Sequence, residues 1–315
     1  MDVELVRQRL GRFKDDLRIT TQVWEDGRRH VRHSAAIDRR SRLSVGTRQL
    51  EAQITKDYHR IDKGLALREP RQGFGAAVAA RLHRDVERYR TLADHDPQVV
   101  DHALSALAAL RAWHADGRHE RGGPTRVPPP AVTLSDDEVE GFFRSRVSVR
   151  DFSDRAVPGA TVRRAVDLAL SSPSVCNRQP WSVWSFSERD AVDRVAALQN
   201  GNAGFRSQIS CLLVVAVDVR LFAGSGERNQ RWVDGALYAM SLVWALHALG
   251  VASCMLNWSV DQERTRRLRE VTGLPGHLDV VTMIAAGYPR DGLRVTRSPR
   301  RPVDSVLHAD VPVRG

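Results

Sequence analysis

Cysteine is scarce in this chain of 315 residues. The three cysteines, Cys176, Cys211 and Cys254, lie far apart. They show no zinc-ligand spacing, and an odd number of well-separated cysteines does not indicate a disulfide framework. We therefore expect a reducing compartment such as the cytoplasm. The first sixteen residues, MDVELVRQRLGRFKDD, contain early acidic residues and no apolar stretch, so we expect no signal peptide.

The chain has little that resembles a membrane span. Residues 236–258 contain no Asp, Glu, Lys or Arg, and this uncharged stretch is long enough to cross a bilayer. The stretch is interrupted by polar side chains, including His247 and Asn257, and Gly250 is typical of a helix C-terminus. We therefore expect a buried helix followed by a strand, and no membrane association.

Several catalytic and nucleotide-binding motifs are missing. The sequence contains no Walker loop, no HExxH and no GxSxG. Gly73-Phe74-Gly75 lacks the third glycine of a dinucleotide fingerprint, because Val78 stands in its place, and it follows REPRQ rather than a strand pattern. We therefore exclude a Rossmann-type reading of this segment.

The net charge of +10 raises nucleic acid as a partner. The basic residues are interleaved with acidic ones, and 25 of the 48 basic residues lie in 1–130 together with 18 of the 38 acidic residues. No regular aromatic spacing accompanies them. We expect a solvated basic surface, and keep a basic adaptor or nucleic-acid-binding protein as an alternative.

The chain divides by composition into three parts. Residues 1–120 show apolar residues at helical spacing, as in 76–92 and 99–114, and predict a helical extension. The segment around residues 121–134 is rich in Gly, Pro and Arg and predicts an extended linker. From 135 to 315 helical and strand patterns alternate, which predicts a second domain with a covered sheet, α/β or α+β.

The expected elements of the second domain are distinct. Ser135 followed by two acids predicts a helix start. The expected helices are 158–171, 189–199, 232–249 and 261–272, and the expected strands are 181–187, 211–219, 253–258 and 280–288. The helix 232–249 is apolar nearly all round, so it must be buried on most faces, in a core and against a second copy.

Three polar segments remain unexplained by these elements. RVSVRDF (146–152) places two arginines four apart with a serine between them, which suits an anion or a surface turn. PSVCNRQPW (173–181) carries an Asn and a Gln two apart in a proline-stiffened loop, which suits a heterocycle or a capped turn. RVTRSPRRP (294–302) clusters arginines after GYP, which suits a phosphate or a basic tail.

Together these segments resemble the nitroreductase family of FMN-dependent oxidoreductases. RVSVRDF, PSVCNRQPW and GYPRDGLRVTRSPRRP occur in that family's order, and VDGALYAMSLVWALHALGVASC resembles its long central helix. HRIDKGL, CNRQPW, ERNQRW and LNWS further resemble a branch with an N-terminal helical extension. The resemblance implies an α+β fold with a central, mainly antiparallel sheet flanked by helices, and a homodimer that binds FMN at the subunit interface.

The resemblance also implies roles for individual residues. Arg146 and Ser148 would contact the phosphate or ribityl chain, and Arg150 the pyrimidine edge of the flavin, whereas Val147 departs from the family's polar residue. The remaining implied cofactor-binding residues lie in the loop, at a strand end and in the tail: Pro173, Ser174, Asn177, Gln179, Leu256, Asn257, Arg300 and Arg301.

The implied activity is hydride transfer between NADH or NADPH and a nitro, quinone or enone-type acceptor, with no catalytic side chain required beyond the flavin contacts. A flavin-dependent dehydrogenase or oxidase in a biosynthetic pathway stays open as an alternative. We expect the N-terminal extension to cover the flavin mouth, the loops 201–207 and 224–230 to act as lids, and Phe205 and Arg206 to touch substrate.

Overall fold

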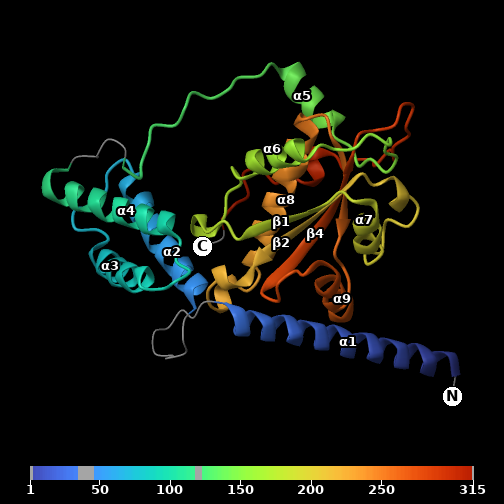
Figure 1. Ribbon diagram of the computed structural model, residues 1–315, viewed down its shortest axis with the longest axis horizontal. Helices are drawn as coiled ribbons and strands as arrows, with labels where there is room; N and C mark the ends of the chain where they lie inside the picture. The colour runs from blue at the N-terminus through green and yellow to red at the C-terminus, as the bar shows by residue number, and fades with distance from the viewer. Residues whose placement is uncertain (1–2, 35–45, 118–122, 314–315) are drawn as a thin grey trace.

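The computed structural model describes residues 3–34, 46–117 and 123–313, with side chains from Asp15 onward (Figure 1). Within these ranges the secondary structure consists of helices and one four-stranded sheet. No helix of the described residues is both long and apolar enough to cross a bilayer. The uncharged stretch 236–258 is divided as expected, into the end of a helix, a turn at Gly250 and a strand.

The sheet has the strand order β1-β2-β4-β3, and all its neighbours are antiparallel. The strands are β1 (Trp181–Phe186), β2 (Cys211–Asp218), β3 (Ala252–Asn257) and β4 (Leu278–Gly287). All eight residues of β2 are buried, which explains its unbroken apolar sequence. The α+β class predicted from the sequence is confirmed.

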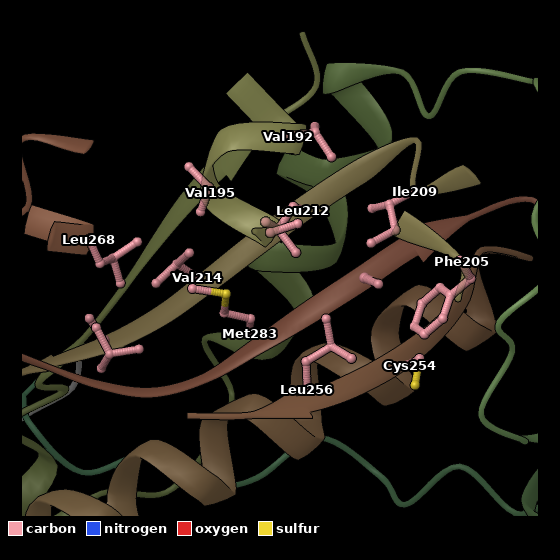
Figure 2. Packing of buried hydrophobic residues seen from close by; sticks show 14 of the residues in the cluster. Val192, Val195, Phe205, Ile209, Leu212, Val214, Cys254, Leu256, Leu268 and Met283 are labelled. Carbon is pink, nitrogen blue, oxygen red and sulfur yellow. The ribbon is translucent and has the colours of Figure 1, made fainter. Parts of the chain in front are cut away.

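Helices cover both faces of the sheet. α6 (Gly159–Ala169) and α8 (Gln230–Ala248) share a core with one face, while α7 (Arg189–Ala196) and α9 (Gln262–Thr272) share a core with the other. Figure 2 shows the second core, in which Leu212, Val214 and Met283 project from the sheet toward Val195 and Leu268. Burial of apolar surface on both faces stabilises the sheet.

α8 approaches the sheet closely because of Gly235. A Cβ atom at this position would lie 2.5 Å from Cγ2 of Val281 on β4. A side chain here would require either the helix or the valine side chain to shift. The tight packing fixes α8 and therefore the segments that α8 supports.

Three N-terminal helices form their own core. They are α2 (Thr47–Leu65), α3 (Ala76–Arg90) and α4 (Pro97–Asp116). Asp57 on α2 is fully buried and accepts both Nε and Nη2 of Arg81 on α3. A bidentate pair of this kind compensates the desolvation of the carboxylate. α2 also contacts residues 175–177 and 219–221, so these helices abut the sheet domain at those turns.

α1 (Val3–His33) crosses the sheet domain beside α9 (Figure 1), and the carbonyl of its last residue accepts Nε2 of Gln49 on α2 at 3.1 Å. Its Arg29 donates to Asp279 of β4 through Nε at 3.1 Å, and Nε2 of His30 lies 2.8 Å from the Gly224 carbonyl oxygen. Polar contacts at its C-terminal end therefore fix this helix to the body of the protein.

An extended segment separates α4 from α5 (Asp136–Ser145). Residues 125–135 lack helix and strand. Ser135 starts this helix, as the sequence predicts, and it forms a capping box with Glu138. At the far end of α5, Phe142 stacks on Trp244 of α8 with ring centroids 5.1 Å apart. The division into a helical extension, a linker and an α+β domain stays our proposal, which this extended segment supports.

Candidate functional site

The segment Arg146–Phe152 lies as an extended strip beside the edge strand β3. The Val149 N–H donates to the Ser253 carbonyl at 3.0 Å, and Ser148 pairs with Ser253 in a parallel bridge. Val149 of this strip is buried and Val147 packs on the core, whereas Arg146 is half-buried and Arg150 is exposed.

The two arginines of the strip have no carboxylate partner among the described residues. Arg150 is exposed and lies beside the thiol of Cys254. Burial raises the pKa of this thiol, and the nearby guanidinium of Arg150 partly opposes that rise. Arg146 lies over the ring of Trp244, with its Cζ 5.8 Å from the ring centroid. Two arginines without a carboxylate partner, whose Cα atoms lie about 13 Å apart along an extended strip, favour an anionic ligand.

A cavity of about 430 Å³ adjoins the strip. Arg146, Val149, His247 and Ser253 are among its lining residues. Nε2 of His247 lies 3.0 Å from Oγ of Ser145 and 3.2 Å from the Phe142 carbonyl oxygen. The histidine is thus held by polar partners within one chain.

The loop Pro173–Pro180 has an unusual backbone. Cys176, Asn177 and Gln179 all adopt positive φ, at 50°, 53° and 47°. Side chains other than glycine rarely adopt this conformation, and when several do so together they often mark a functional site. The side chains of Asn177 and Gln179 are exposed. The surrounding structure therefore holds two amide side chains outward on a strained backbone.

Two buried charged residues support this loop from beneath. Asp234 of α8 is fully buried, and its carboxylate accepts the Val175 N–H at 3.1 Å and the Gln230 amide at 2.8 Å. Burial raises the pKa of Asp234 and these hydrogen bonds oppose that shift. Arg178 is buried beneath the loop, and its Nη2 lies 2.9 Å from Oε1 of Glu227.

Neither supporting residue is marked by the local sequence pattern. Arg178 stands inside PSVCNRQPW, between Asn and Gln. From the sequence alone, a charged residue at this position could contact a ligand or could be buried to support the loop. Asp234 lies almost sixty residues further along the chain. Nothing in its local pattern marks it, except that a lone acid precedes an uncharged run of more than twenty residues.

The end of β3 is fixed by a second polar network. Leu256 is buried in the core, so only its backbone is available to a ligand. Nε2 of Gln199 donates to the Asn257 carbonyl at 3.0 Å, and the side chain of Asn257 is exposed. Oε1 of Gln199 accepts the Asn202 amide at 2.9 Å, so the loop after α7 holds the strand end in place.

The residues expected to touch substrate differ in the structure. Phe205 is only 5% exposed and packs in the core beside Phe152, with ring centroids 6.5 Å apart (Figure 2). Nε of Arg206 donates to Oδ1 of Asn202 at 2.9 Å. The expectation that Phe205 faces a substrate is wrong in this structure, because the apolar ring is buried after the Gly204 turn.

The two loops expected as lids are held by contacts. The loop 201–207 contains the Asn202 network and the buried Phe205. In the loop 224–230, Glu227 accepts the Ala223 N–H at 2.6 Å and pairs with Arg178, while the Gly224 carbonyl contacts His30. Both loops therefore act as supports in this conformation.

The basic tail bonds to itself. Nη1 of Arg300 donates to the Ser298 carbonyl, and Arg301 donates to Oγ and the carbonyl of Ser305. The preceding residues Pro289, Leu293 and Val295 line the cavity beside Arg146. The structure thus brings the beginning of this segment to the strip, while the arginine pair is engaged within its own turn.

The loop Pro173–Pro180 and the strip Arg146–Phe152 contact α8 at two different positions along its axis. The loop contacts Asp234 and the strip contacts Trp244, ten residues further along the helix, which corresponds to about 15 Å of helix axis. One chain therefore presents two separated sets of polar groups, one at Asn177 and one at Arg150.

Comparison with known proteins finds a family that is similar to part of this chain. Residues 143–203, which contain both the strip and the loop, match the model of the nitroreductase family. A protein of Archaeoglobus fulgidus named as an NADH dehydrogenase/NAD(P)H nitroreductase is 28% identical over 157 residues, covering 49% of this chain and 87% of the relative. The matched segment resembles the nitroreductase family, and this relative supports an oxidoreductase.

Other relatives carry related names. Nitroreductase NfnB of Mycolicibacterium smegmatis is 28% identical over 176 residues, covering 42% of this chain and 75% of the relative. A solved nitroreductase of Desulfovibrio desulfuricans, described as a complex with FMN, is 22% identical with a TM-score of 0.48, covering 57% of this chain and all of the other.

Proposed function

We propose that this nitroreductase-family chain transfers hydride between a nicotinamide donor and a small nitro, quinone or enone-type acceptor, with FMN as its cofactor. The observation that carries the proposal is the strip beside β3. There Arg146 and Arg150 flank Ser148 without a carboxylate partner among the described residues. Two guanidiniums and a hydroxyl at this spacing suit a phosphorylated, ring-containing cofactor.

The residues present fit FMN. Arg146 and Ser148 would hold the phosphate or ribityl chain, and Arg150 would donate to the pyrimidine edge of the ring. At the end of β3 the backbone of Leu256 and Asn257 is fixed by Gln199, so its polar groups keep one orientation. Fixed donors bind more strongly than mobile ones because less conformational freedom is lost on binding.

The amide side chains of the loop would serve the cofactor of a second copy. Within one chain the loop and the strip lie about 15 Å apart along α8, so a homodimer is needed to bring them together. α8 also exposes apolar side chains at helical spacing, Val233 and Leu237 among them. Such a stripe supports a two-fold interface along this helix.

When bound, FMN supplies the hydride chemistry. The chain's own residues bind and orient it and set the local field. A cation at the pyrimidine edge stabilises negative charge there, so Arg150 would raise the reduction potential. Each charge-assisted hydrogen bond contributes roughly 1.5–3 kcal/mol.

Anaerobic mixing of the isolated protein with NADPH or NADH tests the activity. The proposal predicts loss of the flavin's visible absorbance on mixing, and its recovery when a nitroaromatic or quinone is added. A flavin that stays oxidised with both nucleotides would reject the nicotinamide donor. In that case a flavin-dependent dehydrogenase that reduces oxygen would be the better reading.

A further inference from the structure

A second cavity, of about 490 Å³, lies between α1 and the sheet domain. α1 contributes its face at residues 18–26, and the opposite wall comes from α8, α9, β4 and the turn after β3. The apolar lining consists of Ile19, Val23, Trp232, Trp258, Val260 and Val280. A volume of several hundred cubic ångströms between two parts of a protein is typical of a small-molecule site.

The apolar lining is incompletely buried. Ile19 is 61% exposed, Val23 66% and Trp232 37%, although all three line the same cavity. The indole of Trp258 is held in place by a hydrogen bond from its Nε1 to Oγ1 of Thr265 at 3.2 Å, so its ring is a fixed wall. When an apolar ligand displaces water from exposed apolar side chains around one cavity, the burial of that surface favours binding.

The carboxylates of the cavity already have partners. Asp279 is buried and pairs with Arg29 and with Nε of Arg231 at 3.0 Å. Asp26 accepts the amide of Gln262 at 3.2 Å. Asp261 caps α9 by accepting the Arg264 N–H at 2.9 Å and lies 3.6 Å from Arg18. None of the three carboxylates is left for a cationic ligand.

Arg269 differs from these groups. Its Nη2 donates to the Leu278 carbonyl at 2.9 Å, but its Nε is buried and has no hydrogen-bond acceptor among the described residues. Burial and the nearby charge of Arg29 lower the pKa of Arg269. A buried donor without an acceptor is unfavourable, and a small shift of the Arg269 side chain would bring this donor to a ligand oxygen in the cavity.

We propose that this cavity binds a planar aromatic acid. The ring would lie among the indoles of Trp232 and Trp258, and the carboxylate would accept from Arg269 at the wall. Aromatic side chains favour a flat ring over an aliphatic one of similar size. Arginine is suited to a carboxylate because its planar group offers several donors.

The cavity adjoins the proposed flavin site. Trp258 directly follows Asn257, whose backbone we assign to the flavin ring. An aromatic acid that also carries a nitro or quinone group would thus lie close to the position for reduction, with α1 restricting its size. This role as hydride acceptor rests on the proposed function, whereas binding of the acid does not.

Isothermal titration of the full chain with 2-naphthoate tests the site, with the uncharged 2-naphthamide as a comparison ligand. We expect 2-naphthoate to bind once per chain and at least tenfold more tightly than the amide. Val23→Glu places a like charge in the cavity and should weaken 2-naphthoate binding at least tenfold. Val31→Glu makes the same change on α1 at a residue that is 81% exposed and outside the cavity, and should leave binding unchanged.

A second pair of variants isolates the arginine. Arg269→Gln should weaken 2-naphthoate about tenfold but leave 2-naphthamide unaffected. The control, Arg266→Gln, changes an exposed residue of the same helix outside the cavity. Equal affinity for acid and amide, no binding of 2-naphthoate, or equal effects of Val23→Glu and Val31→Glu would overturn the proposal. Visible absorbance, recorded on the same samples, reports separately whether FMN is bound.

Discussion

The carboxylate of Asp234 accepts the backbone N–H of Val175 at 3.1 Å. This hydrogen bond joins α8 to the loop that carries Asn177 and Gln179. Because α8 also carries the exposed apolar stripe, one buried side chain connects the proposed dimer interface to the proposed flavin contacts. The loop's positive φ angles are unfavourable alone, so its conformation depends on such supports.

Asp234→Asn tests this support. Asparagine has one side-chain oxygen, so it cannot accept well from both Val175 and Gln230, and one buried donor loses its partner. We expect a loss of about 1.4 kcal/mol in the binding free energy of FMN, which corresponds to a roughly tenfold rise in its Kd. Equilibrium dialysis measures it, with Asp167→Asn on the surface of α6 as the control. An unchanged Kd for Asp234→Asn would contradict the loop's role.

Arg150→Gln tests the electrostatic role of the strip. Without the guanidinium, the anionic reduced flavin loses a stabilising charge, so we expect the midpoint potential to fall by about 30 mV, a tenfold change for a two-electron couple. Spectroelectrochemical titration measures the potential. Arg155→Gln is the matched control, because Arg155 lies over Tyr288 instead. A potential that does not move would place Arg150 away from the ring.

Leu237→Glu tests the interface on α8. Leu237 is exposed in one chain, so the change leaves the core intact but puts a charge into the proposed contact. We expect a monomer in size-exclusion chromatography with light scattering, together with loss of FMN. Val271→Glu, an exposed position on α9, should leave the oligomeric state as it is. A Leu237→Glu dimer with normal FMN content would rule out this interface.

Asp62→Asn tests whether Asp62 makes the stability of the helical extension depend on pH. Burial raises the pKa of Asp62 to about 7 from its ordinary 3.8, and its Oδ1 has no hydrogen-bond partner. The folded state thus holds a proton that the unfolded state releases, and the stability this contributes declines as pH rises from 3.8 to 7.

Asparagine removes that decline because it does not ionise. At pH 8 we expect Asp62→Asn to raise Tm by roughly 2–4 °C relative to the natural chain, with no comparable gain at pH 4. Calorimetry at both pH values measures the difference, and Asp101→Asn on the exposed side of α4 is the control. A gain that is equal at both pH values would show that Asp62 is not the titrating group.

The elements of the sheet domain follow from local sequence. CLLVVAVD is entirely apolar up to its last residue and forms the fully buried β2. Ser135 with its acids starts α5, and Gly250 ends the long helix. These features depend on neighbours within a few residues, so periodicity and capping chemistry are sufficient to predict them.

The supports of the candidate site could not be predicted in this way. Asp234, Gln199 and Arg178 act through contacts between segments that lie far apart in the chain. Phe205 stands among Gly and Arg, a context that predicts an exposed loop, yet it is in the core. The docking of α1 depends on Arg29 meeting Asp279, 250 residues away. Only the folded chain brings these groups together.

FMN binding by the isolated chain and by Arg146→Gln tests the account most directly. We predict that the natural protein retains FMN, or that its flavin-free form takes up one FMN per chain, and that Arg146→Gln binds it at least tenfold more weakly. A colourless protein that does not bind added FMN would contradict the account, as would an Arg146→Gln variant with the natural affinity.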